Sequence, residues 1–209
     1  WAASYNEVSI FDNNIWTRYH RNNTNNVLPY SLLNSHIYID NSNNKCIGHY
    51  NGLALFDNSS WSVVPGISYQ QITSIAQDNS NDIWVGTANY GIYVYNGSFW
   101  SQMTTSNSGI TSNYITSIFV DDNNNKWIGT NNFGLFKYDG SLWKNYNSIN
   151  SGIIDNQILS INQDKLGNIW IGSNKGISVF NENGILPFCV ENNPITQPCR
   201  SQPVNNIIM

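Results

Sequence analysis

The sequence has little charge and few of the side chains from which catalytic sites are usually built. Charged residues make up 11% of the 209 positions, and the formal net charge is -4. Only three Glu, three Arg and three His are present. Nine Lys and Arg against thirteen Asp and Glu do not readily form a surface that neutralises phosphates, so no nucleic-acid partner is expected.

Long hydrophobic runs are also absent. No apolar segment approaches the ~18 residues of a membrane-spanning helix, so contact with a membrane is expected only through a longer parent chain. Disorder is not expected either, because disordered chains are rich in charge and poor in aromatic residues, whereas this chain is 13% aromatic and 40% hydrophobic. Its polarity comes mainly from uncharged groups, including 37 Asn.

Cysteine is scarce, and the three present are Cys46, Cys189 and Cys199. They form no CxxC pair and no Cys/His spacing typical of zinc, so neither a metal nor a cofactor is expected. Cys189 and Cys199 lie ten residues apart in a Pro- and Asn-rich tail, which favours a small disulfide loop in an exported protein. The alternative is two unpaired thiols.

A repeat of 43 residues accounts for most of the chain. Its clearest copies are ITSIAQDNSNDIWVGTANYGIYVYNGSFW from residue 72, ITSIFVDDNNNKWIGTNNFGLFKYDGSLW from 115 and ILSINQDKLGNIWIGSNKGISVFNENGI from 158. The matching residues have structural roles in this interpretation: Trp84, Trp127 and Trp170, followed by Gly86, Gly129 and Gly172.

Two weaker copies come first, one opening at Trp1 and one with Cys46 in the Trp position. All eight tryptophans fall on two positions of the repeat. This pattern favours tryptophans that pack in equivalent places of each blade over tryptophans that form a sugar-stacking platform. Trp84, Trp127 and Trp170 are therefore predicted to be largely buried. The pattern also makes Cys46 a buried apolar substitute.

Each unit has the pattern of four short strands. In the unit from residue 72, strands are expected at 72–76, 83–87, 92–95 and 99–103, and a turn at Asp78–Asp82. Asn96-Gly97 predicts a tight hairpin in which both residues have positive φ, and Asp139-Gly140 repeats it. No segment shows helical spacing over ten residues.

The predicted fold is therefore all-β: a β-propeller of about five four-stranded blades, with each first strand nearest the axis. The units lie near residues 1–36, 37–71, 72–114, 115–157 and 158–185, followed by a tail at 186–209. The tail segment 204–209 is similar to the start of another unit. Either the chain is part of a larger propeller, which we favour, or the tail strand closes a ring of five blades.

These units resemble the two-component regulator propeller repeat, whose pattern is roughly I-x-S-I-x-x-D-x-x-G-N-I-W-I-G-T-x-x-G-G-L-x-x-Y-D. ILSINQDKLGNIWIGSNKGISVF, from residue 158, matches it closely, and the linking phrase Asn-Ser-Gly-Ile begins at Asn107 and at Asn150. The resemblance covers nearly all of residues 1–185, although Cys46 departs from it and the first unit lacks both glycines.

The resemblance implies a periplasmic or extracellular sensor region of a hybrid two-component regulator, many of which respond to oligosaccharides. The alternative is a cell-surface or secretion-associated interaction scaffold, since related propellers occur in such proteins of Bacteroidetes-type bacteria. Neighbouring blades or domains of a longer chain are the expected protein partners. The repeat motif does not fix the family's binding residues, so none is carried over.

The segment before each first strand is the candidate site for an oligosaccharide ligand. Amides pair with hydroxyls in both directions, and aromatic rings cover sugar C–H faces. The candidates are Asn34, His36, Gln70, Gln71, Asn113, Tyr114, Asn156 and Gln157. The alternative is that they only fill surface loops. For Tyr50, Tyr90 and Phe133, before the second glycine, we favour packing between blades.

Two further interpretations are weaker. The Asp/Asn runs at 78–82 and 121–125 lack the Gly and Glu of an EF-hand loop, so turn formation explains them better than calcium. No G-x-S-x-G or H-E-x-x-H motif is present, and no catalytic residue is predicted. A polysaccharide lyase or hydrolase remains an alternative through His20, His36 and His49, which lie near successive blade edges.

Overall fold

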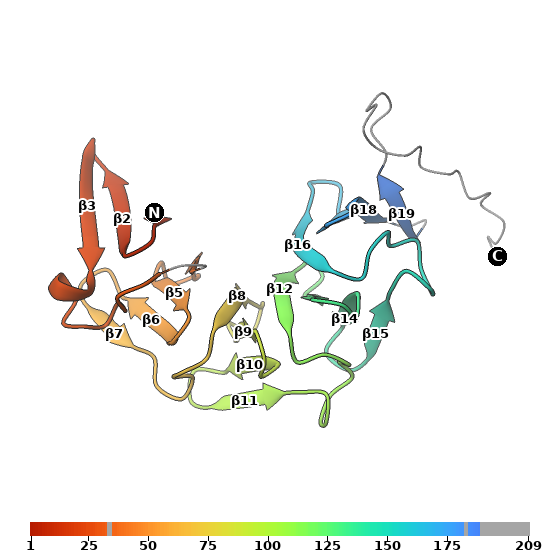
Figure 1. Cartoon of the computed structure of the whole chain (residues 1–209), viewed down its shortest axis with the longest axis horizontal. Helices are drawn as coiled ribbons and strands as arrows, with labels where there is room; N and C mark the ends of the chain where they lie inside the picture. Colours follow the sequence, from red (N-terminus) through yellow and green to blue (C-terminus); the bar gives the residue numbers. More distant parts are fainter. Residues whose placement is uncertain (33–34, 182–183, 189–209) are drawn as a thin grey trace.

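The computed structural model describes residues 1–32, 35–181 and 184–188. They form five antiparallel sheets, the blades, that follow one another along an arc from β1–β3 to β16–β19 (Figure 1). The arc does not close within the described residues. The all-β propeller fold predicted from the sequence is confirmed, as an open part of a propeller. The described residues contain no α-helix, and their one helical turn is η1 (Arg21–Asn23).

Blades 2 to 5 each contain four strands in sequential order. Blade 2 comprises β4 (His36–Ile39), β5 (Lys45–His49), β6 (Gly52–Phe56) and β7 (Trp61–Val63). Blade 3 comprises β8 (Ile72–Gln77), β9 (Ile83–Thr87), β10 (Ile92–Tyr95) and β11 (Trp100–Met103). Blade 4 comprises β12 (Ile115–Val120), β13 (Lys126–Thr130), β14 (Leu135–Tyr138) and β15 (Trp143–Tyr146). Blade 5 comprises β16 (Ile158–Gln163), β17 (Ile169–Ser173), β18 (Gly176–Asn181) and β19 (Gly184–Phe188).

Blade 1 has three strands rather than four: β1 (Ala2–Ala3), β2 (Glu7–Asp12) and β3 (Ile15–His20). They correspond to the second, third and fourth strands of a blade, as expected for a unit whose sequence enters the repeat at its Trp, in the second strand. β19 continues to Phe188, three residues beyond the expected end of its unit. The predicted Cys189–Cys199 disulfide and the strand start at 204–209 lie outside the described residues.

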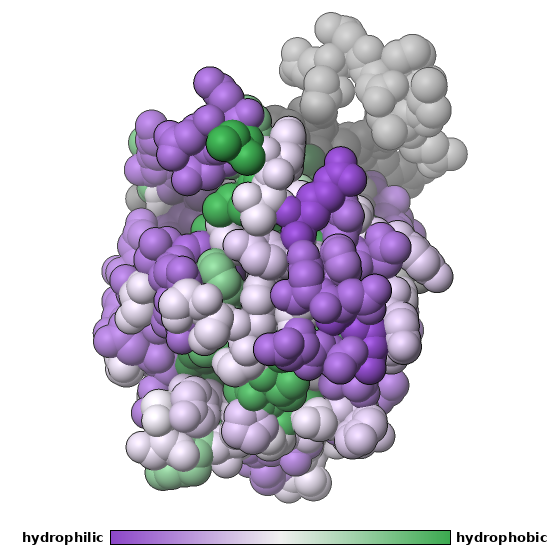
Figure 2. All heavy atoms as spheres, turned by 90° about the vertical axis from the view of Figure 1, so that its left-hand side faces the viewer, coloured by the Kyte–Doolittle hydropathy of each residue, from purple (hydrophilic) through white to green (hydrophobic). Residues whose placement is uncertain are grey.

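The first strand of each complete blade lies on the concave side of the arc, as predicted. In Figure 1, β8, β12 and β16 line this side, and β11 and β15 lie on the convex side. The first strands also contact one another from blade to blade, β4 with β8, β8 with β12 and β12 with β16. The edge of the arc at β2 and β3 is mostly hydrophilic to neutral, with scattered hydrophobic side chains (Figure 2).

The hydrophobic core consists of four clusters, one between each pair of consecutive blades. Trp84 and Trp127 are 4% and 1% exposed and lie in two of these clusters. The prediction of equivalent buried sites is confirmed for both. Trp170 is only half-buried, so the prediction of an equivalent, largely buried site does not hold for it.

Close packing between blades explains the first glycine of the repeat. A Cβ atom on Gly129 would lie 2.7 Å from Cγ2 of Ile158, in the first strand of the next blade. The second glycine has a conformational reason, since Gly134 has a φ of 80° that residues with a Cβ rarely adopt. Glycine at both positions therefore fits the close packing and the backbone conformation of these blades.

The hairpins at Asn96-Gly97 and Asp139-Gly140 differ from the prediction. Each connects its strands through four residues, and only the glycine has positive φ. The Asn96 Oδ1 accepts hydrogen bonds from the backbone N–H groups of Ser98 and Phe99, both at 3.1 Å. This side-chain turn replaces the two-residue turn that the dipeptide indicates.

Candidate functional site

The predicted ligand-binding segments lie at one face of the propeller, which we call the loop face. It consists of the segments that precede β8, β12 and β16 and of the turns between the second and third strands of each blade. The two kinds of segment are joined by backbone hydrogen bonds: Ala88 N–H donates to Gln71 O at 3.1 Å, and Asn131 N–H donates to Tyr114 O at 3.3 Å. The structure thus brings the predicted segments onto a shared surface.

Two of the predicted amides hold their own loops in place. The Asn113 Oδ1 accepts a hydrogen bond from the Thr105 N–H at 3.0 Å, and the Asn156 Oδ1 accepts one from the Ser148 N–H at 2.8 Å. Both bonds span eight residues of linker, at the same place in two units. The oxygens of these amides are therefore engaged in folding the connection between blades.

Gln157 connects two blades. Its Nε2 donates to the Asn131 Oδ1 at 2.9 Å, and its Oε1 accepts from the Asn174 Nδ2 at 2.5 Å. Asn131 and Asn174 belong to the turns after β13 and β17 and were missed by the sequence analysis. Both asparagines lie between the Thr or Ser that ends the second strand and the second glycine of the repeat, and this recurring position was the available sequence signal.

The remaining predicted residues are placed less uniformly. His36 and Gln71 are exposed. Gln70 is half-buried, and its Oε1 is buried without a hydrogen-bond partner among the described residues. Asn34 lies outside the described residues.

Aromatic side chains stand out on the loop face. Tyr50, Tyr90 and Phe133 are 49%, 50% and 50% exposed, and Tyr114 is 41% exposed. The expectation that the first three pack between blades is therefore correct only in part, since half of each side chain contacts solvent. Together with the amides, these rings offer apolar faces beside hydrogen-bonding groups.

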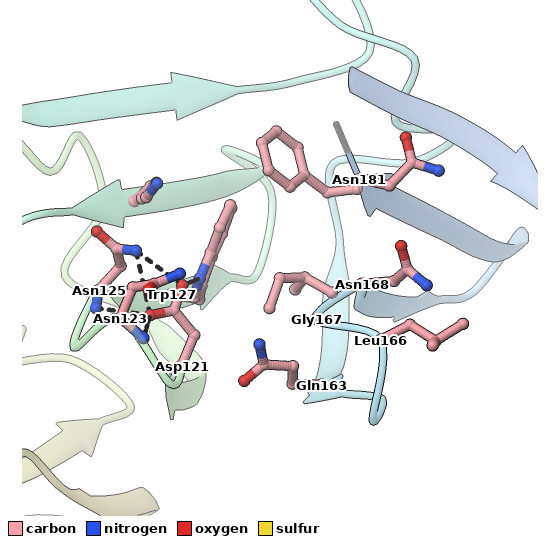
Figure 3. Close-up of a pocket in the computed structure, with 12 residues that line it drawn as sticks. Asp121, Asn123, Asn125, Trp127, Gln163, Leu166, Gly167, Asn168 and Asn181 are labelled. Atoms are coloured by element: carbon pink, nitrogen blue, oxygen red, sulfur yellow. Dashed lines mark hydrogen bonds between the residues drawn. The ribbon is translucent and has the colours of Figure 1, made fainter. Parts of the chain in front are cut away.

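A recess lies at the opposite face, which we call the turn face because it carries the turns between the first and second strands. Antiparallel strands place these turns at the other end of each blade. The recess has a volume of about 540 Å³ and lies between blades 4 and 5 (Figure 3). Asp121, Asn123, Asn125 and Trp127 line one side, and Gln163 and Asn168 are among the residues on the other.

Hydrogen bonds within the Asp/Asn turn occupy the Asp121 carboxylate. Its Oδ1 accepts from the Asn123 and Asn125 N–H groups at 3.0 and 2.8 Å, and its Oδ2 accepts from the Trp127 Nε1 at 2.8 Å. The corresponding turn of blade 5 repeats this arrangement, and the Trp170 indole, followed by the Asn168 amide, lowers the pKa of Asp164 to about 2. These bonds support turn formation over calcium binding, and the described residues contain no group of three His, Cys, Asp or Glu suited to a metal.

The three histidines have separate local roles. The His20 Nδ1 accepts from the Asn22 N–H at 3.3 Å, where it caps η1. His36 opens β4 and is exposed. His49 is 5% exposed, and burial lowers its pKa to about 4, so its imidazole is neutral at pH 7.

Among the described helical residues, none forms a segment long and apolar enough to span a membrane.

The fold and its polar loops define the class of this protein as a β-propeller repeat protein. Three of its units match the family model described as "Two component regulator propeller", at residues 66–89, 109–132 and 152–175. The chain therefore carries two-component regulator propeller repeats, and the resemblance stated from its sequence is confirmed. No characterised relative matches the chain by sequence.

Solved structures with the same fold include the extracellular domain of a two-component system and an enzyme. The extracellular domain of BT4673 from B. thetaiotaomicron, assigned to a hybrid two-component system, superposes with a TM-score of 0.67 at 25% identity. That match covers 84% of this chain but 25% of BT4673. Virginiamycin B lyase from Staphylococcus aureus gives 0.66 at 14% identity, covering 90% of this chain and 64% of the lyase.

A third similar structure is PorZ, a surface component of the type-IX secretion system of Porphyromonas gingivalis. It gives a TM-score of 0.51 at 18% identity, covering 92% of this chain and 39% of PorZ. The identities to PorZ and to the lyase show a shared fold alone. The chain spans less than two thirds of the length of each of these three proteins.

Proposed function

We propose that this propeller is a non-catalytic, ligand-binding part of an extracytoplasmic sensor and that it binds a neutral or weakly charged oligosaccharide at its loop face. The observation that carries the proposal is the row of half-exposed rings beside amides on that face. The family match and the similarity to the extracellular domain of BT4673 support the sensor role and the location outside the cytoplasm.

The chemistry of the loop face suits a sugar better than a charged ligand. Tyr114 and the half-exposed rings of the turns after the second strands present faces that can cover sugar C–H groups, and amides donate and accept hydrogen bonds with hydroxyls. Gln157 and Tyr114 are linked through Asn131. The Asn131 N–H donates to the Tyr114 carbonyl oxygen, and the Gln157 Nε2 donates to the Asn131 Oδ1. The low charge of the chain disfavours a phosphorylated or nucleic-acid partner.

The absence of a catalytic role is part of the same proposal. General acid–base and nucleophilic catalysis need ionisable groups within hydrogen-bond reach of each other and of the substrate. Near the loop face, β5 ends at the buried, neutral His49, whose Nδ1 already accepts a hydrogen bond from the Asn51 N–H at 3.2 Å. In a parent chain of the sensor type, a membrane span and a kinase would follow the propeller.

Glycan-array screening followed by calorimetry tests the proposal. Wild type should bind a neutral glycan with a dissociation constant of roughly micromolar to millimolar, because exposed loops must be ordered on binding. The double variant Tyr114→Ala with Gln157→Ala should bind at least tenfold more weakly, about 1.4 kcal/mol. The matched control, Asn123→Ala with Leu166→Ala, alters the turn face and should bind as wild type does.

Circular dichroism must first show that both double variants are folded. No binding by wild type, or equal binding by the Tyr114/Gln157 variant, would refute the site and favour the scaffold function. Cleavage of any bound glycan would replace the proposal with an enzymatic function.

A further inference from the structure

One position of the repeat is changed where two blades meet. Cys46 occupies the position that a tryptophan holds in the other units. It pairs with Leu55 across β5 and β6 as Trp84 pairs with Val94 across β9 and β10. A cavity of about 550 Å³ lies beside it, between blades 2 and 3. Its volume is close to that of the recess between blades 4 and 5, but its wall holds the smaller Cys46 side chain in place of an indole.

The neighbouring interfaces show how an indole sits in such a space. Between blades 4 and 5, the Trp127 Nε1 donates to the Asp121 Oδ2 at 2.8 Å, and its ring centroid lies 5.0 Å from that of Phe180. Between blades 3 and 4, Trp84 makes the same hydrogen bond to Asp78 at 3.1 Å and lies 6.1 Å from Tyr138. The indole is held by one carboxylate and by one ring of the next blade.

The walls of this site are retained between blades 2 and 3. Asp40 stands at the position of Asp121, and Tyr95 stands at the position of Phe180. Both line the cavity, as does Ile83, which corresponds to Ile169. We call this space the indole slot. The recess between blades 4 and 5 has the same framework, but Trp127 forms its wall where Cys46 lies in the indole slot (Figure 3).

The carboxylate of the slot lacks a donor that its counterparts have. The Asp121 Oδ2 accepts from both the Asn125 Nδ2 and the Trp127 Nε1, each at 2.8 Å. Among the described residues, the Asp40 Oδ2 accepts only from the Asn44 Nδ2, at 2.8 Å. A bound N–H group could complete the arrangement, since a carboxylate oxygen accepts more than one hydrogen bond.

The slot also has no cationic partner for Asp40 among the described residues. Lys126 forms an ion pair with Asp78 at 2.9 Å between blades 3 and 4, but the corresponding residue beside Asp40 is Ile83. The uncompensated carboxylate disfavours anions. Leu53, Leu55 and Trp100 make the rest of the wall largely apolar, and the exposed Val63 places part of it at the surface.

We propose that the indole slot binds a small planar aromatic molecule that carries an N–H donor, of the indole class. Its ring would lie against Tyr95 and the apolar wall, and its N–H would donate to the Asp40 Oδ2. Burial raises the pKa of the Cys46 thiol to about 12, so this wall stays neutral. Neither Tyr114 nor Gln157 lines the slot, so this proposal does not depend on glycan binding.

Titration of the folded chain with indole, followed by ¹H–¹⁵N NMR, tests the proposal. Wild type should show saturable shifts, including that of the Trp100 Nε1–H, which donates to the Pro65 carbonyl at 2.9 Å beside the slot. 1-Methylindole has nearly the same ring but no donor, and it should bind about tenfold more weakly. This comparison uses wild type alone and does not depend on a variant folding.

Cys46→Trp restores the residue of the other repeats and should abolish the shifts, whereas Cys46→Ala should keep them. Binding by Cys46→Trp equal to that of wild type would overturn the location. Equal affinities for indole and 1-methylindole would overturn the hydrogen bond to Asp40. No saturable shift with wild type at the solubility limit of indole would overturn the proposal as a whole.

Discussion

Replacing Trp127 with alanine tests whether the interfaces between blades hold the propeller together. The indole is 1% exposed, lies 5.0 Å from the Phe180 ring and donates to Asp121. A buried aromatic side chain removes about 150–250 Å² from water, which at about 25 cal/mol per Å² corresponds to roughly 4–6 kcal/mol. Measured large-to-small changes of this kind cost about 3–5 kcal/mol, and we expect a loss in that range.

The hydrogen bond contributes less than the packing. After the substitution, the Asp121 carboxylate keeps its bonds from Asn123 and Asn125, so it is not left unpaired. Trp127→Phe retains an aromatic ring without the donor, and it should lose about 1–2 kcal/mol of unfolding free energy. The difference between the two variants separates ring packing from the hydrogen bond.

Urea unfolding followed by far-UV circular dichroism provides the measurement, because the substitution itself changes the tryptophan fluorescence. Trp16→Ala is the control, since Trp16 is 58% exposed and its loss should cost less than about 1 kcal/mol. The comparison requires that the urea dependence of the unfolding free energy stays unchanged. A loss below about 1 kcal/mol for Trp127→Ala would refute the packing argument.

Three further predictions concern other parts of the repeat. Gly129→Ala should cost about 1–3 kcal/mol in the same assay, because its Cβ would lie 2.7 Å from Ile158; an unchanged stability would contradict the close approach of the blades. Between pH 6.5 and about 4, His49 is protonated in the unfolded chain but not in the folded chain, so the unfolding free energy should fall by up to about 3 kcal/mol as the pH drops. The variant His49→Thr should lack this part of the pH dependence in urea unfolding. The raised pKa of Cys46 should protect its thiol from alkylation by iodoacetamide at pH 8 until the chain unfolds, which peptide mass spectrometry can measure. Rapid alkylation of the folded chain would contradict this prediction.

The sequence by itself determined the repeated blade. Alternating apolar residues, Asp/Asn turns and paired glycines recur every 43 residues, and each is a local signal that strands and turns obey. The strands β9 and β10 lie where the pattern predicts them, and Trp84 and Trp127 are buried as their equal spacing indicates. Equivalent positions in stacked units share the same surroundings, so the repeat also predicted their common role.

Other local sequence features were compatible with more than one structure. Asn96-Gly97 indicates a two-residue turn, but the Asn96 side chain can bond to the backbone N–H groups beyond it and form a longer one. The sequence likewise identified Asn113 and Asn156 as polar loop residues. It could not indicate that their oxygens fasten the linkers, because this depends on how each linker folds back on itself.

Only the tertiary structure decided what lies between the blades. Gln157 joins Asn131 and Asn174 across two units, and the Cys46 position opens into a cavity because its walls come from blade 3 as well as blade 2. Such contacts join residues that are tens of positions apart, and their geometry depends on the twist and spacing of whole sheets. A pattern within one unit specifies the blade, whereas the space between two blades exists only once they have packed together.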